Sequence, residues 1–387
     1  MVRKSDSKIK IAGAGPSGLA AAIRLARAGF PVELFEARDM VGARFIGDFQ
    51  VIENMSRPED ALEMLKRFGL ETSFFIRPVR EAVFFDHRLR PQPVRSLRPF
   101  GYFIRRGREE GTLDRGLLAQ ALAAGVEVHF QKRIRPEEAD RDGAPPVIVA
   151  TGPPVADGLA KEMTFHAPLP DTVWVIFDMN LSPGGYTYLF VLGGFATFGC
   201  AITRDFSRID EYFDRSLRRF QEMASFTVEN EKRGYSFMNF CLKESAQAGR
   251  RLFVGEAGGF QDYLFGLGLR YALTTGFLAA ESLIRDEPYD RLWKQEIGPT
   301  QETSLVNRFL YEWGGNEGLA AFIRRAGRGD LREYLARWSA DRPWKRWMVP
   351  MIKWGWGDRK PSTRPPYPHW RRKRPTEPHP DLGPVNR

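Results

Sequence analysis

The residues whose types and spacing point most directly to chemistry form a loop near the N-terminus, Gly13-Ala14-Gly15-Pro16-Ser17-Gly18, which fits the pattern G-x-G-x-x-G. In such a loop the first glycine allows a tight turn. The second lets the backbone approach a pyrophosphate, and the third lets the following helix pack close to the strand. The helix N-terminus adds free N–H groups and a positive dipole end, both of which attract phosphates.

Glu36 extends this pattern, because it lies 23 residues after Gly13, at the end of the next predicted strand. A carboxylate there can accept hydrogen bonds from the two hydroxyls of an adenosine ribose. The spacing therefore predicts a dinucleotide site. The alternative is a glycine-rich structural turn, with Glu36 as a solvated strand end.

The elements that must position this loop follow the order strand, helix, strand. Ile9–Ala12 is typical of a short buried strand, Leu19–Ala28 of a helix, and Val32–Glu36 of a second strand. Such a βαβ start requires a parallel sheet. Similar elements are predicted later in the chain, namely the helices Asp114–Ala124 and Leu269–Ile284 and the strands Val126–Phe130, Val147–Ala150 and Leu252–Val254. The nucleotide-binding elements are thus expected in three separated segments, with β-rich sequence between them.

The stretch 179–203 contains no charged residue and is long enough to be mistaken for a membrane span. Pro183–Gly185 and Gly193-Gly194 interrupt it and leave two short pieces rich in aromatic and β-branched residues. We therefore predict a β-hairpin with strands Tyr186–Leu192 and Phe195–Ile202 rather than a transmembrane helix.

Two further motifs give the glycine loop a family context. Val149-Ala150-Thr151-Gly152 ends a predicted strand, and Leu252–Phe260 continues through Gly266-Leu267-Gly268 toward Gly276. With the glycine loop and Glu36, they resemble the FAD flavoproteins of the p-hydroxybenzoate hydroxylase type and, within that group, the geranylgeranyl reductase family. Members of that family have an ATG stretch at the first motif and G-D-A-A-G-F followed by G-G-G at the second. The resemblance covers about residues 8–340.

The sequence departs from this family at two places. Glu256 stands where the family has the aspartate that holds the ribityl chain of the flavin. Its extra methylene lengthens the reach by about one carbon–carbon bond, so the loop must retreat or the contact becomes water-mediated; an ordinary surface carboxylate is the alternative. Some members also carry a cysteine loop after the second strand, which here is Gly42–Gln50, without cysteine. Arg44, Asp48 and Gln50 are expected to position substrate or contact phosphates, or else to lie in a solvated loop.

The segment Pro183–Val191 is similar to the P-x-x-Y-x-W-x-F-P pattern of geranylgeranyl reductases, with Tyr188 in place of the tryptophan and Val191 in place of the second proline. On a strand, Tyr186, Tyr188 and Phe190 point to the same side. Such an aromatic face either walls a hydrophobic tunnel or simply packs a sheet against a helix.

The resemblance implies roles for individual residues. Tyr186, Tyr188 and Tyr263 are candidate proton donors, with a held water as the alternative, and Phe190 and Phe260 are candidate substrate contacts. No metal-ligand spacing is visible, so no metal is expected. The residues expected to bind the cofactor are Gly13, Gly15, Pro16, Ser17, Gly18, Glu36, Ala37, Arg38, Arg44, Val128, Ala150, Thr151, Gly152, Gly255, Glu256, Gly266, Gly268 and Leu269.

The fold class implied by the resemblance is α/β. A Rossmann-like FAD-binding domain in three sequence segments is joined by an inserted antiparallel β-sheet substrate domain and a helical C-terminal part. The expected boundaries are 1–72, 106–158 and 249–286 for the three FAD-binding segments, 73–105 for a β insertion, 159–248 for the substrate domain, 287–340 for the C-terminal helices and 341–387 for a basic, partly disordered tail.

The function implied by the resemblance is that of an FAD-dependent oxidoreductase. Reduced flavin would deliver hydride to a C=C bond of a hydrophobic, isoprenoid-type substrate. The sequence has no second glycine fingerprint, so electrons are expected from transiently bound NADPH or from a small redox protein. Two alternatives stay open: an FAD-dependent monooxygenase or dehydrogenase, and a non-redox cyclase or binding protein that holds flavin.

The positive charge of the chain is concentrated at its C-terminal end. Residues 341–387 hold 12 basic and 4 acidic side chains, so +8 of the net +10 lies there, and six of the nine tryptophans lie between 338 and 370. This confinement argues against nucleic-acid binding. If the substrate is a lipid, segment 341–374 is expected to contact a membrane surface, because tryptophan favours the bilayer interface and cations favour anionic headgroups. The alternative is a docked helix followed by a solvated tail.

The two cysteines, Cys200 and Cys241, are too few for a disulfide framework, which is typical of a reducing compartment. We therefore expect a cytoplasmic protein, peripheral on the inner face of the membrane if the C-terminal segment binds lipid. The sequence indicates no oligomeric state.

Overall fold

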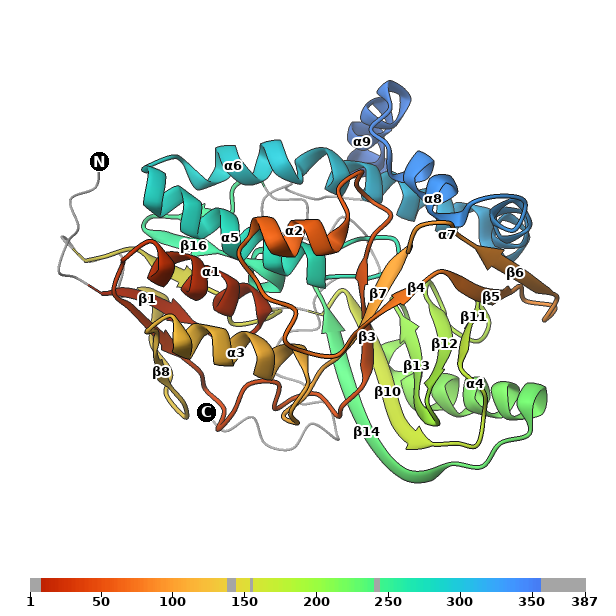
Figure 1. Cartoon of the computed structure of the whole chain (residues 1–387). Coiled ribbons are helices and arrows are strands. Elements are labelled where there is room, and N and C mark those ends of the chain that lie inside the picture. The colour runs from red at the N-terminus through yellow and green to blue at the C-terminus, as the bar shows by residue number, and fades with distance from the viewer. Residues whose placement is uncertain (1–7, 138–143, 154–155, 240–243, 356–387) are drawn as a thin grey trace.

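The computed structural model describes residues 8–137, 144–153, 156–239 and 244–355, with the side chains of the last helix described as far as Ile352. Three sheets and the helices that cover them make up this part of the chain (Figure 1). The predicted tail beyond residue 355 lies outside the described residues, as does Cys241.

The main sheet has six strands in the order β15-β16-β9-β1-β2-β8, and all except β15 run parallel. Its strands are β1 (Ile9–Ala12), β2 (Val32–Phe35), β8 (Glu127–His129), β9 (Val147–Val149), β15 (Gln247–Ala248) and β16 (Arg251–Phe253). The helices α1 (Pro16–Arg27), α3 (Leu113–Ala123) and α5 (Leu269–Arg285) belong to the same part of the molecule (Figure 1). Strands from distant parts of the chain thus form one Rossmann-like sheet, as predicted.

Helices α1 and α5 pack so closely that one contact requires glycine. A Cβ on Gly276 would lie 2.1 Å from the backbone oxygen of Ser17. Because glycine has no side chain, α5 can lie directly against the first turn of α1 at this position.

The second sheet has seven strands in the order β14-β10-β13-β12-β11-β5-β6. They are β5 (Glu81–Phe85), β6 (Pro91–Arg95), β10 (Gly158–His166), β11 (Thr172–Ile176), β12 (Tyr186–Leu192), β13 (Phe195–Ile202) and β14 (Glu229–Met238). Helix α4 (Ile209–Ala224), which follows the short 3₁₀ helix Phe206–Arg208, packs on one face, where Phe198 contacts Phe213 and Phe220. The sheet is antiparallel except where β5 and β11 run parallel.

The uncharged stretch forms the predicted hairpin, with β12 and β13 paired antiparallel from Tyr186 to Leu192. Among the residues that the structure describes, no helix is both long enough and apolar enough to cross a membrane.

A third, three-stranded sheet has the order β3-β7-β4, with β3 (Phe49–Glu53), β4 (Ile76–Val79) and β7 (Gly101–Arg105). The short helix α2 (Ala61–Arg67) lies between β3 and β4 in the chain. Strands were expected between residues 73 and 105, and the structure divides them between two sheets, because β5 and β6 join the seven-stranded sheet. Strand β3 was not predicted, because its polar residues had indicated a loop.

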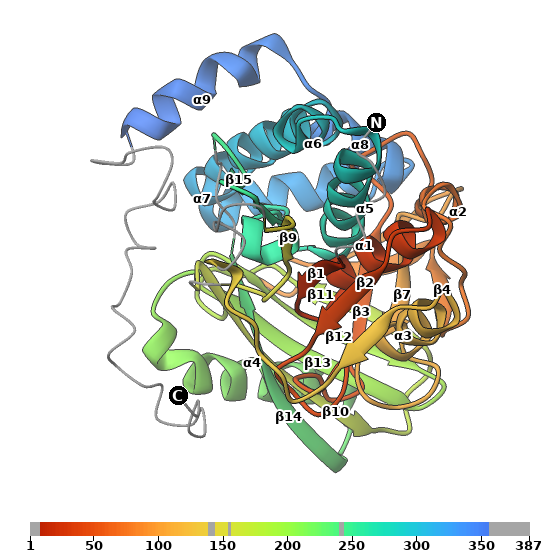
Figure 2. The ribbon, with the colours of Figure 1, turned by 90° about the vertical axis from the view of Figure 1, so that its left-hand side faces the viewer.

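The C-terminal helices are α6 (Tyr289–Glu296), α7 (Gly298–Ala326), α8 (Leu331–Ser339) and α9 (Pro343–Gly355). Helix α7 is interrupted at Gly315, where φ is 52°. Helix α9 lies at the edge of the molecule (Figure 2) and packs on α7 through Val349 and Ile352, which share a cluster with Leu305 and Val306.

Candidate functional site

A cavity of about 600 Å³ lies where the main sheet, the seven-stranded sheet and the loop before α5 meet. It brings together side chains and backbone from the glycine loop, the segment 40–51, strands β10, β12 and β14, and the segment 265–269. The residues predicted from the sequence that line it are Gly15, Pro16, Ser17, Glu36, Arg38, Arg44, Ala150, Thr151, Gly152, Tyr186, Tyr188, Phe190, Glu256, Gly266, Gly268 and Leu269.

Seven predicted site residues do not line this cavity: Gly13, Gly18, Ala37, Val128, Gly255, Phe260 and Tyr263. Phe260 is buried in the core of the main domain, where its ring lies edge-on to Trp293. Tyr263 is buried in the cluster that α9 joins. Val128 lies on β8, at the edge of the main sheet. The structure therefore places the predicted substrate contact Phe260 and the candidate proton donor Tyr263 in packing positions.

The glycines of the first loop divide into two that serve the fold and one that faces open space. A Cβ on Gly13, whose φ is +106°, would lie 2.3 Å from the Ala150 carbonyl oxygen, and a Cβ on Gly18 would lie 2.0 Å from the Gly13 oxygen. A Cβ on Gly15 would meet nothing within 4 Å. Gly15 thus lets a ligand approach the backbone without being required by the packing of the protein itself.

The N-terminus of α1 opens into the cavity at this glycine. Gly15 is the N-cap, no side chain caps the helix, and its first turn contains no acidic residue. The N–H groups of this turn are therefore available to an anion.

Glu36 is held in place by the backbone on either side of it. Its Oε2 accepts a hydrogen bond of 2.9 Å from the Ala14 N–H, and its Oε1 accepts one of 2.9 Å from the Arg38 N–H. Each carboxylate oxygen has a further acceptor position. The carboxylate is thus fixed at the cavity wall and can still accept hydroxyl groups.

Arg44 and Glu256 form an ion pair within the cavity lining, with 3.4 Å between Nη2 and Oε2. Glu256 belongs to a 3₁₀ helix, Gly255–Gly258, whose Glu256 carbonyl oxygen accepts a hydrogen bond of 2.7 Å from Asn239 Nδ2. The Glu256 side chain therefore reaches Arg44 in the cavity lining and is not an isolated surface carboxylate.

Asp48 and Gln50 belong to a hydrogen-bond network that includes the buried Arg106 and Asp114. Gln50 donates to Asp48 Oδ2 at 2.9 Å and accepts from Arg106 Nη1 at 3.2 Å. Arg106 in turn makes two hydrogen bonds of 2.9 Å to the buried carboxylate of Asp114. The alternative of a solvated loop is therefore wrong for the buried Asp48, whereas Gln50 is half-buried on β3. Burial raises the pKa of Asp48, which is 1% exposed.

The aromatic residues of β12 form one wall of the cavity. The rings of Tyr188 and Phe190 stack with 4.6 Å between their centroids, and Tyr186 donates a hydrogen bond of 2.7 Å to the Phe265 carbonyl oxygen. These residues also belong to a hydrophobic core cluster. The same rings thus pack in the core and line the cavity, and a role in holding a hydrophobic substrate stays a prediction.

Glu162 on β10 is a cavity residue that the sequence analysis missed. It is 6% exposed and accepts hydrogen bonds from the Tyr188 hydroxyl at 3.0 Å and from Ser236 Oγ at 2.6 Å. Burial raises its pKa to about 7, and the charge of Asp48 adds to this shift. The sequence signal was weak, because the adjacent charged residues Lys161 and Glu162 break the alternation of apolar and polar residues in Leu159–Phe165.

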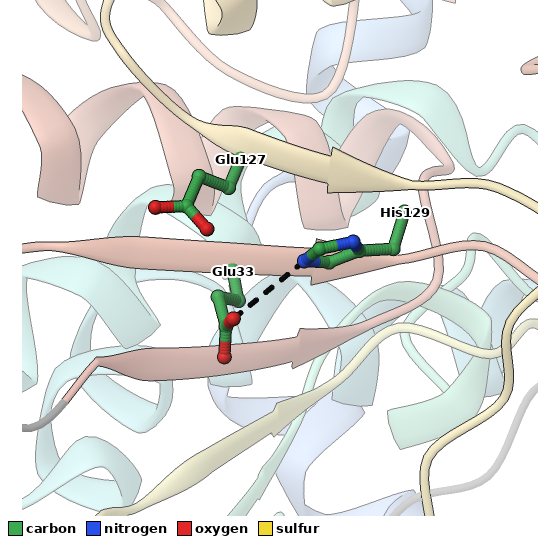
Figure 3. Close-up of side chains that lie close together, drawn as sticks. All are labelled: Glu33, Glu127 and His129. Carbon is green, nitrogen blue, oxygen red and sulfur yellow. Dashed lines mark ion pairs between the residues drawn. The ribbon is translucent and has the colours of Figure 1, made fainter.

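One group of side chains away from the cavity has the spacing of metal ligands. Within the described residues, Glu33, Glu127 and His129 lie close enough to share an ion (Figure 3). They come from the paired strands β2 and β8. The Lys8 ammonium lies 2.7 Å from a Glu127 oxygen and 3.5 Å from a Glu33 oxygen, so a lysine already forms ion pairs with both carboxylates. The group forms a surface ion-pair network.

The comparisons with known proteins agree on the fold. A family model described as an NAD(P)-binding Rossmann-like domain matches residues 11–47. No curated protein matches this sequence.

Solved structures resemble about nine tenths of the chain. A geranylgeranyl bacteriochlorophyll reductase-like protein from Thermoplasma acidophilum has a TM-score of 0.68 at 18% identity, over 89% of this chain and 98% of that one. The p-nitrophenol 4-monooxygenase of Pseudomonas putida has 0.59 at 14% identity, over 87% and 99%. The flavin-dependent halogenase CmlS has 0.56 at 18% identity, over 90% and 70%. The chain thus has the mixed α/β fold of FAD-dependent oxidoreductases.

Proposed function

We propose that this protein binds FAD and is an FAD-dependent oxidoreductase. The main support for the proposal is the arrangement of backbone and side chains at the start of α1. There the helix N-terminus is uncapped, Gly15 leaves open space, and the Glu36 carboxylate is fixed beside it. This combination suits a dinucleotide, because phosphates need N–H donors and close backbone approach, and a ribose needs an acceptor.

The residues present fit the parts of FAD. The backbone of Gly15 and Ser17 would bind the pyrophosphate, and Glu36 would accept the adenosine ribose hydroxyls. Glu256, with Arg44 as its counter-ion, would accept hydrogen bonds from the ribityl hydroxyls. The N-terminus of α5 at Gly268 would face the flavin ring. When bound, FAD would supply hydride transfer to or from a substrate.

The reaction that we propose is reduction of a C=C bond in a hydrophobic, isoprenoid-type substrate. Support comes from the aromatic wall of Tyr186, Tyr188 and Phe190, which gives the cavity an apolar side suited to a hydrocarbon chain. These residues would orient the chain and exclude water from the reacting carbon atoms. The likeness to a geranylgeranyl reductase-like protein fits this choice.

Oxygen chemistry is the second candidate, because a monooxygenase and a halogenase share the fold. The electron donor would be NADPH or a small redox protein. The family model covers 11–47, the loop assigned here to FAD, and so does not indicate a separate nicotinamide site.

The C-terminal helix supports a second part of the proposal, contact with an anionic membrane surface. Trp344, Trp347 and Met351 follow a three- and four-residue spacing on α9 and are 48%, 81% and 69% exposed. The opposite face, including Val349 and Ile352, packs against the body. An exposed Trp and Met stripe suits the bilayer interface, and the excess of cations after residue 341 suits anionic headgroups.

An anaerobic single-turnover experiment tests the proposed reaction. The purified full chain, loaded with FAD and reduced with dithionite, is mixed with geranylgeraniol in the absence of oxygen. Reduction of a C=C bond predicts loss of the reduced-flavin spectrum and a product two hydrogens heavier by mass spectrometry. An oxygenated product that forms only in air would instead favour the monooxygenase candidate.

A further inference from the structure

We propose that Glu162 is the proton reservoir of this cavity and that the hydroxyl of Tyr188 passes its proton to the substrate. The inference rests on the proposed function, because a reduced C=C bond needs a proton as well as a hydride. The proton would come from two residues of the seven-stranded sheet, Glu162 on β10 and Tyr188 on β12.

The geometry of the sheet brings the two side chains together. Glu162 on β10 is paired with Gly199 on β13, which is paired in turn with Tyr188 on β12. The three residues thus form a row across three strands. A Cβ on Gly199 would lie 2.3 Å from Tyr188 Cζ and 2.4 Å from its hydroxyl oxygen. The tyrosine ring therefore lies across the glycine, and its hydroxyl reaches Glu162 Oε1 at 3.0 Å.

This contact depends on the departure of the chain from the aromatic motif that it resembles. A tryptophan at position 188 would have no hydroxyl, whereas Tyr188 has one that can both donate and accept a proton. Ser236 on β14 binds the other oxygen of Glu162 at 2.6 Å. Tyr188, Glu162 and Ser236 all line the cavity, so the chain of hydroxyl and carboxyl groups opens onto the space assigned to the substrate.

The surroundings of Glu162 stabilise its protonated form relative to that of an ordinary glutamate. The charged and titratable groups that face it are Asp48 and Arg44 from segment 40–51 and Tyr186 and Tyr188 from β12. Burial, followed by the negative charge of Asp48, raises the pKa of Glu162 to about 7, while Arg44 acts in the opposite direction. A carboxyl group with such a pKa can both release and regain a proton under physiological conditions.

Tyr188 needs such a partner. Burial and the neighbouring carboxylate raise its pKa well above the ordinary value, so a bare tyrosinate would be costly. In the proposed step a C–H bond forms at the substrate carbon as the Tyr188 O–H bond breaks. The Glu162 O–H proton moves to the tyrosine oxygen, and Glu162 then regains a proton from water. Bound reduced FAD, as in the proposed function, would supply the hydride that completes the reduction.

Two readouts on the full chain test the inference. Infrared difference titration follows the carboxyl C=O band without any substrate. We expect a group that titrates near neutral pH and is lost in Glu162→Gln. Its pKa should rise in Tyr188→Phe, because that variant removes a hydrogen bond to the ionised form. Glu231→Gln, an exposed glutamate on β14, is the matched control and should leave the titration unchanged.

The second readout is anaerobic oxidation of the dithionite-reduced, FAD-loaded protein by geranylgeraniol. Glu162→Gln and Tyr188→Phe should each slow this step by about 100-fold or more, the usual contribution of a positioned general acid. The wild-type rate should fall as pH rises through neutrality, and this dependence should vanish in Glu162→Gln.

The outcomes separate the two proposals. A wild-type protein that reduces no alkene overturns the proposed function, and this inference with it. A wild-type protein that reduces geranylgeraniol, with both variants keeping its rate and pH profile, overturns the inference alone. A Glu162 carboxylate that stays ionised down to its ordinary pKa also overturns it.

Discussion

Gly15→Ala separates ligand binding from folding in this protein. The residue has an ordinary φ of −76°, and a Cβ there would meet no protein atom within 4 Å. The fold should therefore accept alanine at a cost within about 1 kcal/mol, as for other changes at an N-cap. The new methyl group would occupy the space through which a pyrophosphate approaches the backbone.

The expected loss of affinity follows from the hydrogen bonds at this position. Displacing the phosphate from one N–H donor forfeits a hydrogen bond to a charged group, worth about 1.5–3 kcal/mol. Because 1.4 kcal/mol corresponds to about tenfold, the Kd for FAD should rise roughly 10- to 100-fold. Titration of the apoprotein with FAD, followed by flavin fluorescence, measures this change, and thermal unfolding without FAD measures the cost to the fold.

Two further glycines provide the contrast. Gly18→Ala places its Cβ 2.0 Å from a backbone oxygen and should destabilise the apoprotein by about 1–3 kcal/mol or more. Gly318→Ala on α7, which also has open space around it, lies outside the cavity lining and should leave FAD affinity unchanged. If Gly15→Ala binds FAD as tightly as the wild type, the assignment of the phosphate site to this loop is refuted.

Three other variants have definite expected outcomes. Asp114→Ala, which removes the carboxylate partner of the buried Arg106, should lower the free energy of unfolding by about 3–5 kcal/mol in urea titration. Glu162→Gln should remove part of the pH dependence of stability. Between pH 4.5 and about 7 the folded chain keeps the Glu162 proton and the unfolded chain does not, so the free energy of unfolding of the wild type should fall by about 3 kcal/mol as the pH rises across that window. Parallel curves of unfolding free energy against pH for the wild type and the variant would contradict this. Replacing Trp347 and Met351 together by Ser should weaken the affinity for anionic vesicles at least about tenfold in a sedimentation assay, because burial of each apolar side chain in the bilayer contributes about 1.5–3 kcal/mol. Leu97→Ser, which changes another exposed apolar residue, should leave this affinity unchanged.

The glycine loop and the hairpin were predictable because local geometry dictates the residue types there. At Gly13 the backbone has a positive φ and lies against the Ala150 carbonyl group, so only glycine fits. The requirement is therefore visible in the sequence as a glycine at that position. Likewise, the glycine pair 193–194, with φ of 57° and 77°, marks the turn between β12 and β13. Short-range constraints of this kind leave a trace in the sequence.

The contacts around Glu162 left no such trace. Its partners Tyr188 and Ser236 are 26 and 74 residues away, and they meet it only because β10 lies between β13 and β14 in the sheet. Phe260 shows that a recognisable motif can also mislead about the position of a side chain. It belongs to a motif that borders the cavity, but the turn at Gly259, with φ of 73°, leads its ring into the core. A motif specifies the path of the backbone more closely than it specifies the direction of each side chain.

The most direct test of the account is the cofactor content of the purified full chain. We predict that the protein takes up flavin, shows its visible absorption, and releases FAD rather than FMN on denaturation, since Glu36 and the α1 N-terminus are placed for an adenosine diphosphate portion. A well-folded protein that remains colourless and binds no FAD in titration would contradict the central claim.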